Sequence, residues 1–385
     1  MLSNYKNFNG ARLQVARKYR GKTITELAED IGVTKQSISQ FENGQISPQF
    51  DTLMKITSTL KFPREYFYEE DTMDIQQGNT YFRALSKMSK KEENVQKERT
   101  KMIGKLFSFL NEYIEFPTLN LPKFDENSSI EEKALLLRKH WGIEEEPISD
   151  ILYLMEKNGI IVTSIFTDSD NVDAFSQPQR INGKKYYFVV LGNDKWSATR
   201  RQFSAAHELG HIILHDDFID LENMTREELR HIENEAHEFA AAFLLPKNAF
   251  ANDVNLYPTT LNYYKQLKKK WKTSISAMLV RANRLDILSY SSYQTLMKKM
   301  SRLGWRTEEP LDDTLVMSKP TVLKRAVDIL IDNDILDEKE FLKELSSRGL
   351  TLPREEIELL LGLEEGRLLP KKIDNKIIEM PVRKI

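Results

Sequence analysis

Apolar residues recur at helical spacing through the first 70 residues, where short segments each present one apolar face. Thr23 and Thr34 are suitable N-caps for two of these segments, and Gly32 suits the turn between them. The pattern predicts a module of five helices at residues 8–19, 24–31, 35–44, 48–60 and 63–68.

The rest of the chain is also mostly helical in pattern, with one short β-rich stretch. Residues 69–98 are densely charged and lead into a helical pattern at 102–116, so we expect one long helix that joins two domains. Apolar, β-branched runs predict strands at residues 160–165, 174–176 and 186–191. Further helices are expected at residues 129–140, 148–158, 200–215, 232–246, 263–288 and 321–363. The fold class is therefore mainly α with a small β-sheet (α+β).

His207 and His211 stand four residues apart in the helix expected at 200–215. Residues at this spacing share a helix face, so both imidazoles can reach one divalent metal ion. Glu208 lies beside the first histidine without taking a ligand position, and it can remove a proton from a water at the metal. We expect zinc, although manganese also suits such a donor set.

The helix expected at 232–246 supplies a third metal ligand. Glu235 lies in register with Phe239 and Phe243, so the apolar face of this helix carries one acid. A buried carboxylate needs a cation, and two histidines with one glutamate leave an open position for water. Glu233 is the rival ligand, disfavoured because it lies off this apolar face.

The outward face of the helix at 35–44 is short, polar and rich in amides, which suits hydrogen bonding in the major groove of double-stranded DNA. The alternative is a five-helix module that contacts only proteins. Residues 1–67 hold ten Lys or Arg against six Asp or Glu, an excess of four that favours DNA. The expected base contacts are Lys35, Gln36, Ser37 and Gln40, and the expected phosphate contacts are Asn43 and Lys55.

Composition limits the class of protein. The chain has 385 residues, of which 40% are hydrophobic and 30% charged, enough for two or three globular domains. It contains no cysteine, so it has neither disulfides nor thiol ligands. The amino terminus lacks the apolar core of a signal peptide, and no apolar run is long enough to cross a membrane. We therefore expect a cytoplasmic protein without a membrane partner.

Residues 23–48, TITELAEDIGVTKQSISQFENGQISP, resemble the XRE-type helix-turn-helix of phage-repressor-like proteins. The turn L-A-x-x-I-G-V, the ending I-S-x-x-E-x-G and the following Pro48 occur in one register. Ile24 departs from the pattern, because many family members carry a phosphate-contacting Gln there. The resemblance implies DNA binding, often as a homodimer that reads two half-sites.

The motif HELGH, followed about two dozen residues later by E-A-x-E-F-A-A-A-F-L-L-P, is similar to the ImmA/IrrE metallopeptidases. The resemblance implies a zincin-like lobe with ligands His207, His211 and Glu235 and catalytic Glu208. His237 stands where the family commonly has Asn or Asp, and we expect it on the helix surface or behind the ligands, with a role as fourth ligand as the alternative. His215 continues the face of the two histidines and is expected either to stabilise a transition-state oxyanion or to bond a neighbouring carbonyl.

Residues 172–176, VDAFS, also match the ImmA/IrrE pattern. A sheet edge commonly accepts a peptide as an added strand, so this segment is expected either to bind substrate or simply to pack in the sheet.

Together the two resemblances imply a DNA-binding regulator that is also a metal-dependent endopeptidase, with a transcriptional repressor as its protein substrate, cut under stress or phage-related signals. Two alternatives stay open: a regulator whose peptidase-like lobe senses a ligand or metal without proteolysis, and an antitoxin-type regulator. The expected domains are a helix-turn-helix at 1–70, a linker helix region at 71–118, a peptidase at 119–255, a helical region at 256–370 and a tail at 371–385.

Overall fold

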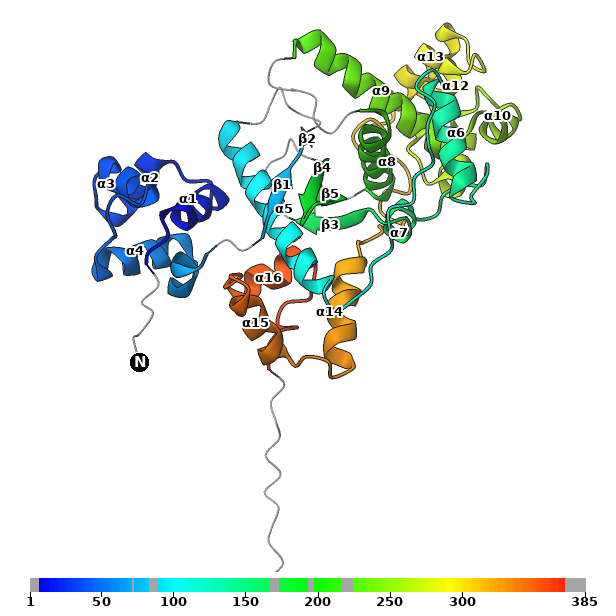
Figure 1. The fold of residues 1–385 in the computed structure, drawn as a ribbon. Coiled ribbons are helices and arrows are strands. Elements are labelled where there is room, and N and C mark those ends of the chain that lie inside the picture. The colour runs from blue at the N-terminus through cyan, green and yellow to red at the C-terminus, as the bar shows by residue number, and fades with distance from the viewer. Residues whose placement is uncertain are drawn as a thin grey trace, which may run out of the picture.

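The computed structural model describes residues 7–70, 73–82, 89–165, 173–192, 197–215 and 224–370. Helices dominate it and surround one small sheet (Figure 1), which confirms the predicted fold class. The expected tail lies outside the described residues. None of the helices described has the length and apolar composition needed to span a bilayer.

The amino-terminal module forms as its caps predict. Thr23 accepts a hydrogen bond from the backbone N–H of Glu26, which bonds back in a capping box, and Gly32 ends that helix at φ 73°. Thr34 caps the next helix by accepting from the N–H of Ser37. The fifth segment is a 3₁₀-helix. The elements are α1 (Gly10–Tyr19), α2 (Ile24–Ile31), α3 (Lys35–Glu42), α4 (Phe50–Leu60) and η1 (Arg64–Tyr68).

The sheet contains the three predicted strands and two more. Its path is β1-β4-β5-β3, in which β3 runs parallel to β5 and the other pairs are antiparallel, while β2 also pairs with β4. The strands are β1 (Ile75–Gln77), β2 (Tyr81–Phe82), β3 (Ile161–Ile165), β4 (Ala174–Ile181) and β5 (Lys184–Gly192). Neither β1 nor β2 was expected, because strands this short show no alternating pattern.

Of the two alternatives for residues 172–176, the residues described support packing in the sheet and not a substrate-binding edge. In β4, Phe175 pairs with Phe82 on one side and Val190 on the other, and Ser176 pairs with Tyr81 and Val189. Both sides of the strand are already occupied here, so it has no open edge for a peptide. Val172 lies outside the described residues.

Helices cover both faces of the sheet (Figure 1). The predicted long helix is present as α5, and Ser274 caps α12 by accepting a hydrogen bond from the backbone N–H of Ala277. The remaining helices are α5 (Lys90–Leu110), α6 (Ile130–His140), α7 (Ile151–Lys157), α8 (Ala198–Leu214), α9 (Arg226–Leu244), α10 (Lys247–Val254), α11 (Leu261–Trp271), α12 (Ile275–Arg284), α13 (Tyr290–Arg302), α14 (Val322–Asp332), α15 (Glu338–Ser347) and α16 (Arg354–Leu361).

The alternation along β5 separates two hydrophobic cores. Phe188 and Val190 belong to a core that also contains residues of α1–α4, α5 and α14–α16. Tyr187, Val189 and Leu191 belong to a second core, built with residues of α6–α13. Because successive side chains of a strand point to opposite faces, β5 places the amino-terminal module and α14–α16 on one side and α8 and α9 on the other.

Candidate metal centre

The two histidines of the HELGH motif lie on α8 and are fully buried, as is Glu208 between them. Nε2 of His207 lies 3.1 Å from Nε2 of His211, so the rings converge as the four-residue spacing predicts. The two ring nitrogens that face each other are the atoms with which histidines bind metals.

Helix α9 crosses α8 at a point where both helices carry small residues. A Cβ on Gly210 would lie 3.0 Å from the backbone oxygen of Ala236 and 3.1 Å from its Cα. Glycine therefore allows this close crossing, since a Cβ here would be tighter than most Cβ contacts in proteins and would press on helix backbone. The crossing fixes which residues of α9 reach the histidines.

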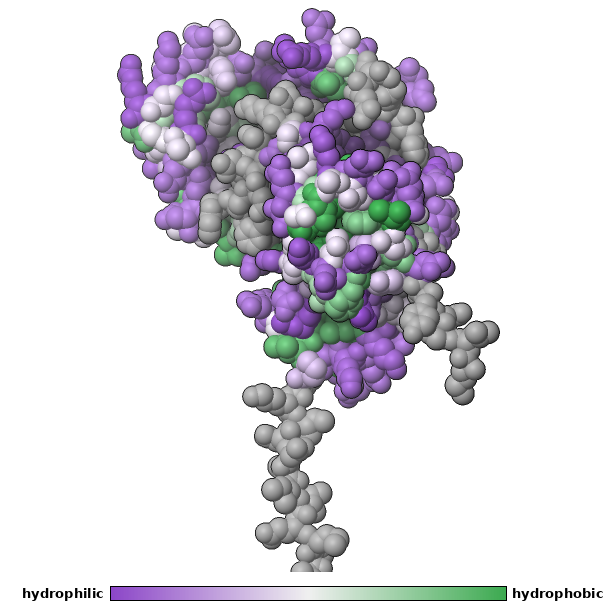
Figure 2. All heavy atoms as spheres, turned by 90° about the vertical axis from the view of Figure 1, so that its left-hand side faces the viewer, coloured by the Kyte–Doolittle hydropathy of each residue, from purple (hydrophilic) through white to green (hydrophobic). Residues whose placement is uncertain are grey.

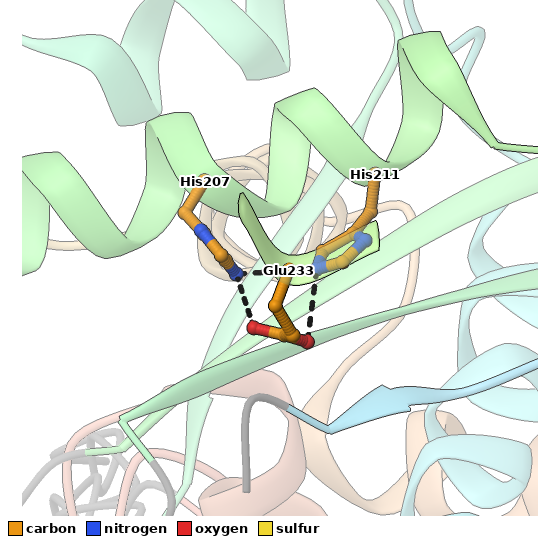
Figure 3. A group of neighbouring side chains, drawn as sticks. All are labelled: His207, His211 and Glu233. Carbon is orange, nitrogen blue, oxygen red and sulfur yellow. Dashed lines mark hydrogen bonds and ion pairs between the residues drawn. The ribbon is translucent and has the colours of Figure 1, made fainter. Parts of the chain in front are cut away.

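Glu233, one turn before Ala236, extends its carboxylate to both histidines (Figure 3). Its Oε2 lies 3.2 Å from Nε2 of His207 and its Oε1 lies 3.5 Å from Nε2 of His211. Among the residues that the structure describes, these three form the one group of at least three His, Asp or Glu whose ligand atoms all lie within 4.8 Å of one another.

The sequence favoured Glu235 over Glu233 as the third ligand. The geometry does not support that prediction, because the structure does not bring Glu235 to the two histidines. Oε2 of Glu235 lies 3.2 Å from Nε2 of His215 and 3.3 Å from Nδ1 of His231 instead. Positions two apart on a helix differ by about 200° in direction, so only one of the two glutamates can face the histidine pair. Apolar periodicity identified the buried face of α9 but not which of its flanks meets the histidines.

The three side chains fit a divalent metal ion. A tetrahedral ion with bonds of about 2.0–2.1 Å separates its ligand atoms by about 3.3 Å. Here the two Nε2 atoms lie 3.1 Å apart, and each has one of the two Glu233 oxygens at 3.2 or 3.5 Å. Burial lowers the pKa of His207 to about 3, so its ring is neutral near pH 7, the form that binds a metal. Burial raises the pKa of the Glu233 carboxyl, but contacts with His207 and His211 outweigh burial and hold that pKa well below its ordinary value.

Glu208 is oriented by a residue that the sequence had not suggested. Oγ of Ser176, on β4, donates a 2.8 Å hydrogen bond to Oε2 of Glu208. Ser176 is itself buried, and β4 packs against α8. In the sequence, Ser176 ends the segment 172–176 that matches the ImmA/IrrE pattern, but nothing there linked its hydroxyl to Glu208.

His215 and His237 occupy different sides of the histidine pair. The ring of His237 lies 4.4 Å from that of His207, centroid to centroid, and also stacks on Phe203 at 5.9 Å. Nδ1 of His215 lies 3.0 Å from Nδ1 of His211. Both are thus neighbours of the converging group, and neither is part of it.

The residues expected to contact DNA lie at the surface of the amino-terminal module. Lys35, Gln36 and Gln40 project from α3, where Lys35 and Gln36 are exposed and Gln40 is half-buried. Ser37 is half-buried, and its hydroxyl lies 2.8 Å from that of Thr34. The exposed phosphate candidates are Asn43, the C-cap of α3, and Lys55 on α4. Figure 2 shows that this side of the molecule is largely hydrophilic with smaller apolar patches.

Two family models match separate parts of the chain. The model described as Helix-turn-helix matches residues 13–67, which include α2 and α3. The model described as the IrrE N-terminal-like domain, of peptidase family M78, matches residues 155–283, which include both α8 and α9. No curated protein matches the chain. The chain therefore joins an XRE-type helix-turn-helix to an IrrE-like domain of peptidase family M78, a combination typical of a transcription regulator.

Proposed function

We propose that this protein is a DNA-binding transcription regulator that hydrolyses a peptide bond in a protein substrate by metal-dependent chemistry. The observation that carries the proposal is the convergence of His207, His211 and Glu233 beside the buried carboxylate of Glu208. A site that only bound a metal for structure would not need a base next to it.

In this proposal, His207, His211 and Glu233 hold the metal. A divalent ion bound there would activate a water molecule and polarise the scissile carbonyl. Glu208 takes the proton from the attacking water and later gives it to the leaving amine. Ser176 holds Oε2 of Glu208 in place from β4, so that the carboxylate does not have to reorient during the reaction.

Zinc is the metal we propose, because two imidazoles and one carboxylate with an open position are its usual catalytic donor set. Manganese remains the alternative for a His-His-Glu group. We propose a DNA-binding repressor as substrate, on the family resemblance alone, and double-stranded DNA as the partner of α3.

We also propose that the protein binds DNA as a dimer of two copies of this chain. Ile46, Phe50 and Met54 expose 47%, 63% and 44% of their surface and stand four residues apart, from just before α4 to its middle. Phe50 and Met54 share a face of α4, and exposed apolar side chains that lie together favour contact with another protein surface. Sedimentation analysis tests this: Phe50→Asp should yield monomers at a concentration where the wild type is dimeric.

The second candidate function is a regulator whose IrrE-like lobe senses a metal or ligand without proteolysis. The two functions differ in what they require of Glu208. Candidate repressors should be incubated with the wild type, with the wild type plus chelator and with Glu208→Gln, and fragments identified by mass spectrometry. We expect fragments from the untreated wild type only. Fragments that persist with Glu208→Gln would contradict hydrolysis through this base.

A further inference from the structure

A continuous line of hydrogen-bond contacts leads from the metal centre to the protein surface. Nδ1 of His211 lies 3.0 Å from Nδ1 of His215, and Nε2 of His215 lies 3.2 Å from Oε2 of Glu235. The same Oε2 lies 3.3 Å from Nδ1 of His231, whose side chain is 74% exposed. We call His211, His215 and Glu235 the positioning chain.

The chemistry of imidazole fixes where the protons of the positioning chain must be. A neutral imidazole carries one N–H and one acceptor nitrogen, and the carboxylate of Glu235 only accepts. Glu235 therefore requires the proton of His215 on Nε2, which leaves Nδ1 of His215 as an acceptor. That acceptor requires the proton of His211 on Nδ1, which leaves the lone pair of Nε2 aimed at His207 and Glu233.

The burial of the side chains favours a single arrangement of these contacts. His211 is fully buried and the side chain of His215 is 5% exposed, so water has little access to compete for their ring nitrogens. His207, by contrast, has a buried Nδ1 with no hydrogen-bond partner among the described residues. His211 is thus the proposed ligand whose ring is held by a contact at Nδ1, the nitrogen that faces away from the metal centre.

We propose that Glu235 and His215 are positioning residues that set the tautomer and ring orientation of the metal ligand His211. The proposal rests on the metal-dependent function proposed above and deepens it, because it gives Glu235 a role that reaches the metal through His215 and His211. Partners behind a metal-binding histidine typically contribute 10–100-fold to metal affinity.

The first test measures zinc affinity of the purified full-length protein by competition with a chromophoric chelator. Glu235→Ala and His215→Ala should each bind zinc about 10–100-fold more weakly than the wild type. Glu233→Ala, which removes a direct contact, should lose more. Glu238→Ala is the matched control, because Glu238 is exposed on the same helix, and it should bind zinc as the wild type does.

A second measurement separates positioning from loss of packing. The Oδ1 of Asn can replace the acceptor Nδ1 of His, so His215→Asn should retain more zinc affinity than His215→Ala. In His215→Asn, Glu235 no longer acts on His211, so adding Glu235→Ala should cost nothing further. Couplings of this kind appear as non-additivity in a double-mutant cycle.

Ring nitrogen chemical shifts of zinc-loaded protein give a direct readout of the tautomer. We expect a protonated Nδ1 on His211 in the wild type and a change in its hydrogen bonding in Glu235→Ala. Wild-type zinc affinity in Glu235→Ala, or additive losses in the cycle, would overturn the positioning role.

The outcomes distinguish this proposal from the proposed function. If zinc affinities follow the expected order but no protein is cut, the positioning chain stands and the peptidase function fails. If cleavage depends on Glu208 while Glu235→Ala binds zinc normally, the peptidase function stands and the positioning chain fails.

Discussion

Ser176 connects the sheet to the proposed base, since its hydroxyl donates to Glu208 from the adjacent strand. A hydrogen bond to a charged group contributes about 1.5–3 kcal/mol. Ser176→Ala should therefore lower kcat of peptide cleavage about tenfold or more while zinc affinity stays at the wild-type value. The measurement is steady-state cleavage alongside chelator competition. Equal losses in both would assign Ser176 a structural role instead.

His207 gives the metal-free protein a predictable pH dependence. Its pKa is lowered to about 3 by burial, against about 6.5 in an unfolded chain, so the unfolded state binds more protons between these values. The free energy of unfolding must then fall as pH falls below about 6.5, by up to about 1.4 kcal/mol per pH unit from this group. Between pH 7 and 5 few carboxylates contribute, since most titrate below this range.

Denaturant unfolding of chelator-treated protein at pH 7, 6 and 5 measures that slope. His207→Gln should show a shallower dependence than the wild type, because glutamine does not titrate. His140→Gln is the control for exchanging a histidine for a glutamine, since His140 is exposed on α6. Identical slopes in wild type and His207→Gln would contradict the buried, neutral state of His207.

At the scale of elements, the metal centre depends on the crossing of α8 and α9 at Gly210 and Ala236. Gly210→Ala should separate the helices slightly, and Gly210→Val should separate them more, because the closest atoms belong to the backbone of α9. We expect a destabilisation of about 1–3 kcal/mol and weaker zinc binding, both increasing with side-chain size. Thermal unfolding and chelator competition check this. Unchanged zinc binding in Gly210→Val would contradict the close crossing.

The side chains of the helix-turn-helix should contribute to DNA binding in two ways, some by contacting bases and others by contacting phosphates. Gln36→Ala should change which bases are preferred, whereas Lys55→Ala, at an exposed residue of α4 expected to contact phosphate, should weaken binding to all duplexes and flatten its salt dependence. Selection from random duplexes, followed by affinity measurement at several salt concentrations, separates the two effects. Glu29→Ala, on the exposed face of α2, is the control. Loss of all binding preference in that control would argue against α3 as the reading helix.

The helices and their caps were predictable because capping is local. Thr23, Thr34 and Ser274 each bond a backbone N–H within three residues, so the sequence alone identifies them. The choice between Glu233 and Glu235 was not predictable, because it depends on which flank of α9 meets α8. Strands β1 and β2 were missed for a similar reason: their stability comes from pairing with β4, more than 90 residues away in the chain.

At the scale of the whole molecule, polar contacts attach the helix-turn-helix to the carboxyl-terminal helices. Nη1 of Arg12 donates a 2.9 Å hydrogen bond to the backbone oxygen of Gly349. Glu356, on α16, accepts from the hydroxyl of Tyr19 and lies 2.7 Å from Nη1 of Arg20. Since α14 and α16 also pack on β3 and α5, the DNA-binding module is connected through them to the sheet that supports α8.

Removing Glu356 should loosen this attachment. Glu356→Ala leaves the buried Tyr19 hydroxyl and Arg20 without that carboxylate, which we expect to cost about 2 kcal/mol or more. Calorimetry should then show the helix-turn-helix unfolding at a lower temperature than the rest of the chain. Glu355→Ala is the matched control, because the Glu355 side chain is 65% exposed and pairs only with its neighbour Arg354 in the contacts described. Equal effects of both variants would contradict a specific contact at Glu356.

The most direct test of the central claim is a crystal structure of zinc-loaded protein with anomalous data at the zinc edge. The account predicts one strong peak about 2.0–2.2 Å from Nε2 of His207, Nε2 of His211 and a carboxylate oxygen of Glu233, with Glu208 beside it and not bound to it. A peak bound by Glu235 in place of Glu233, or no peak between the two histidines, would contradict it.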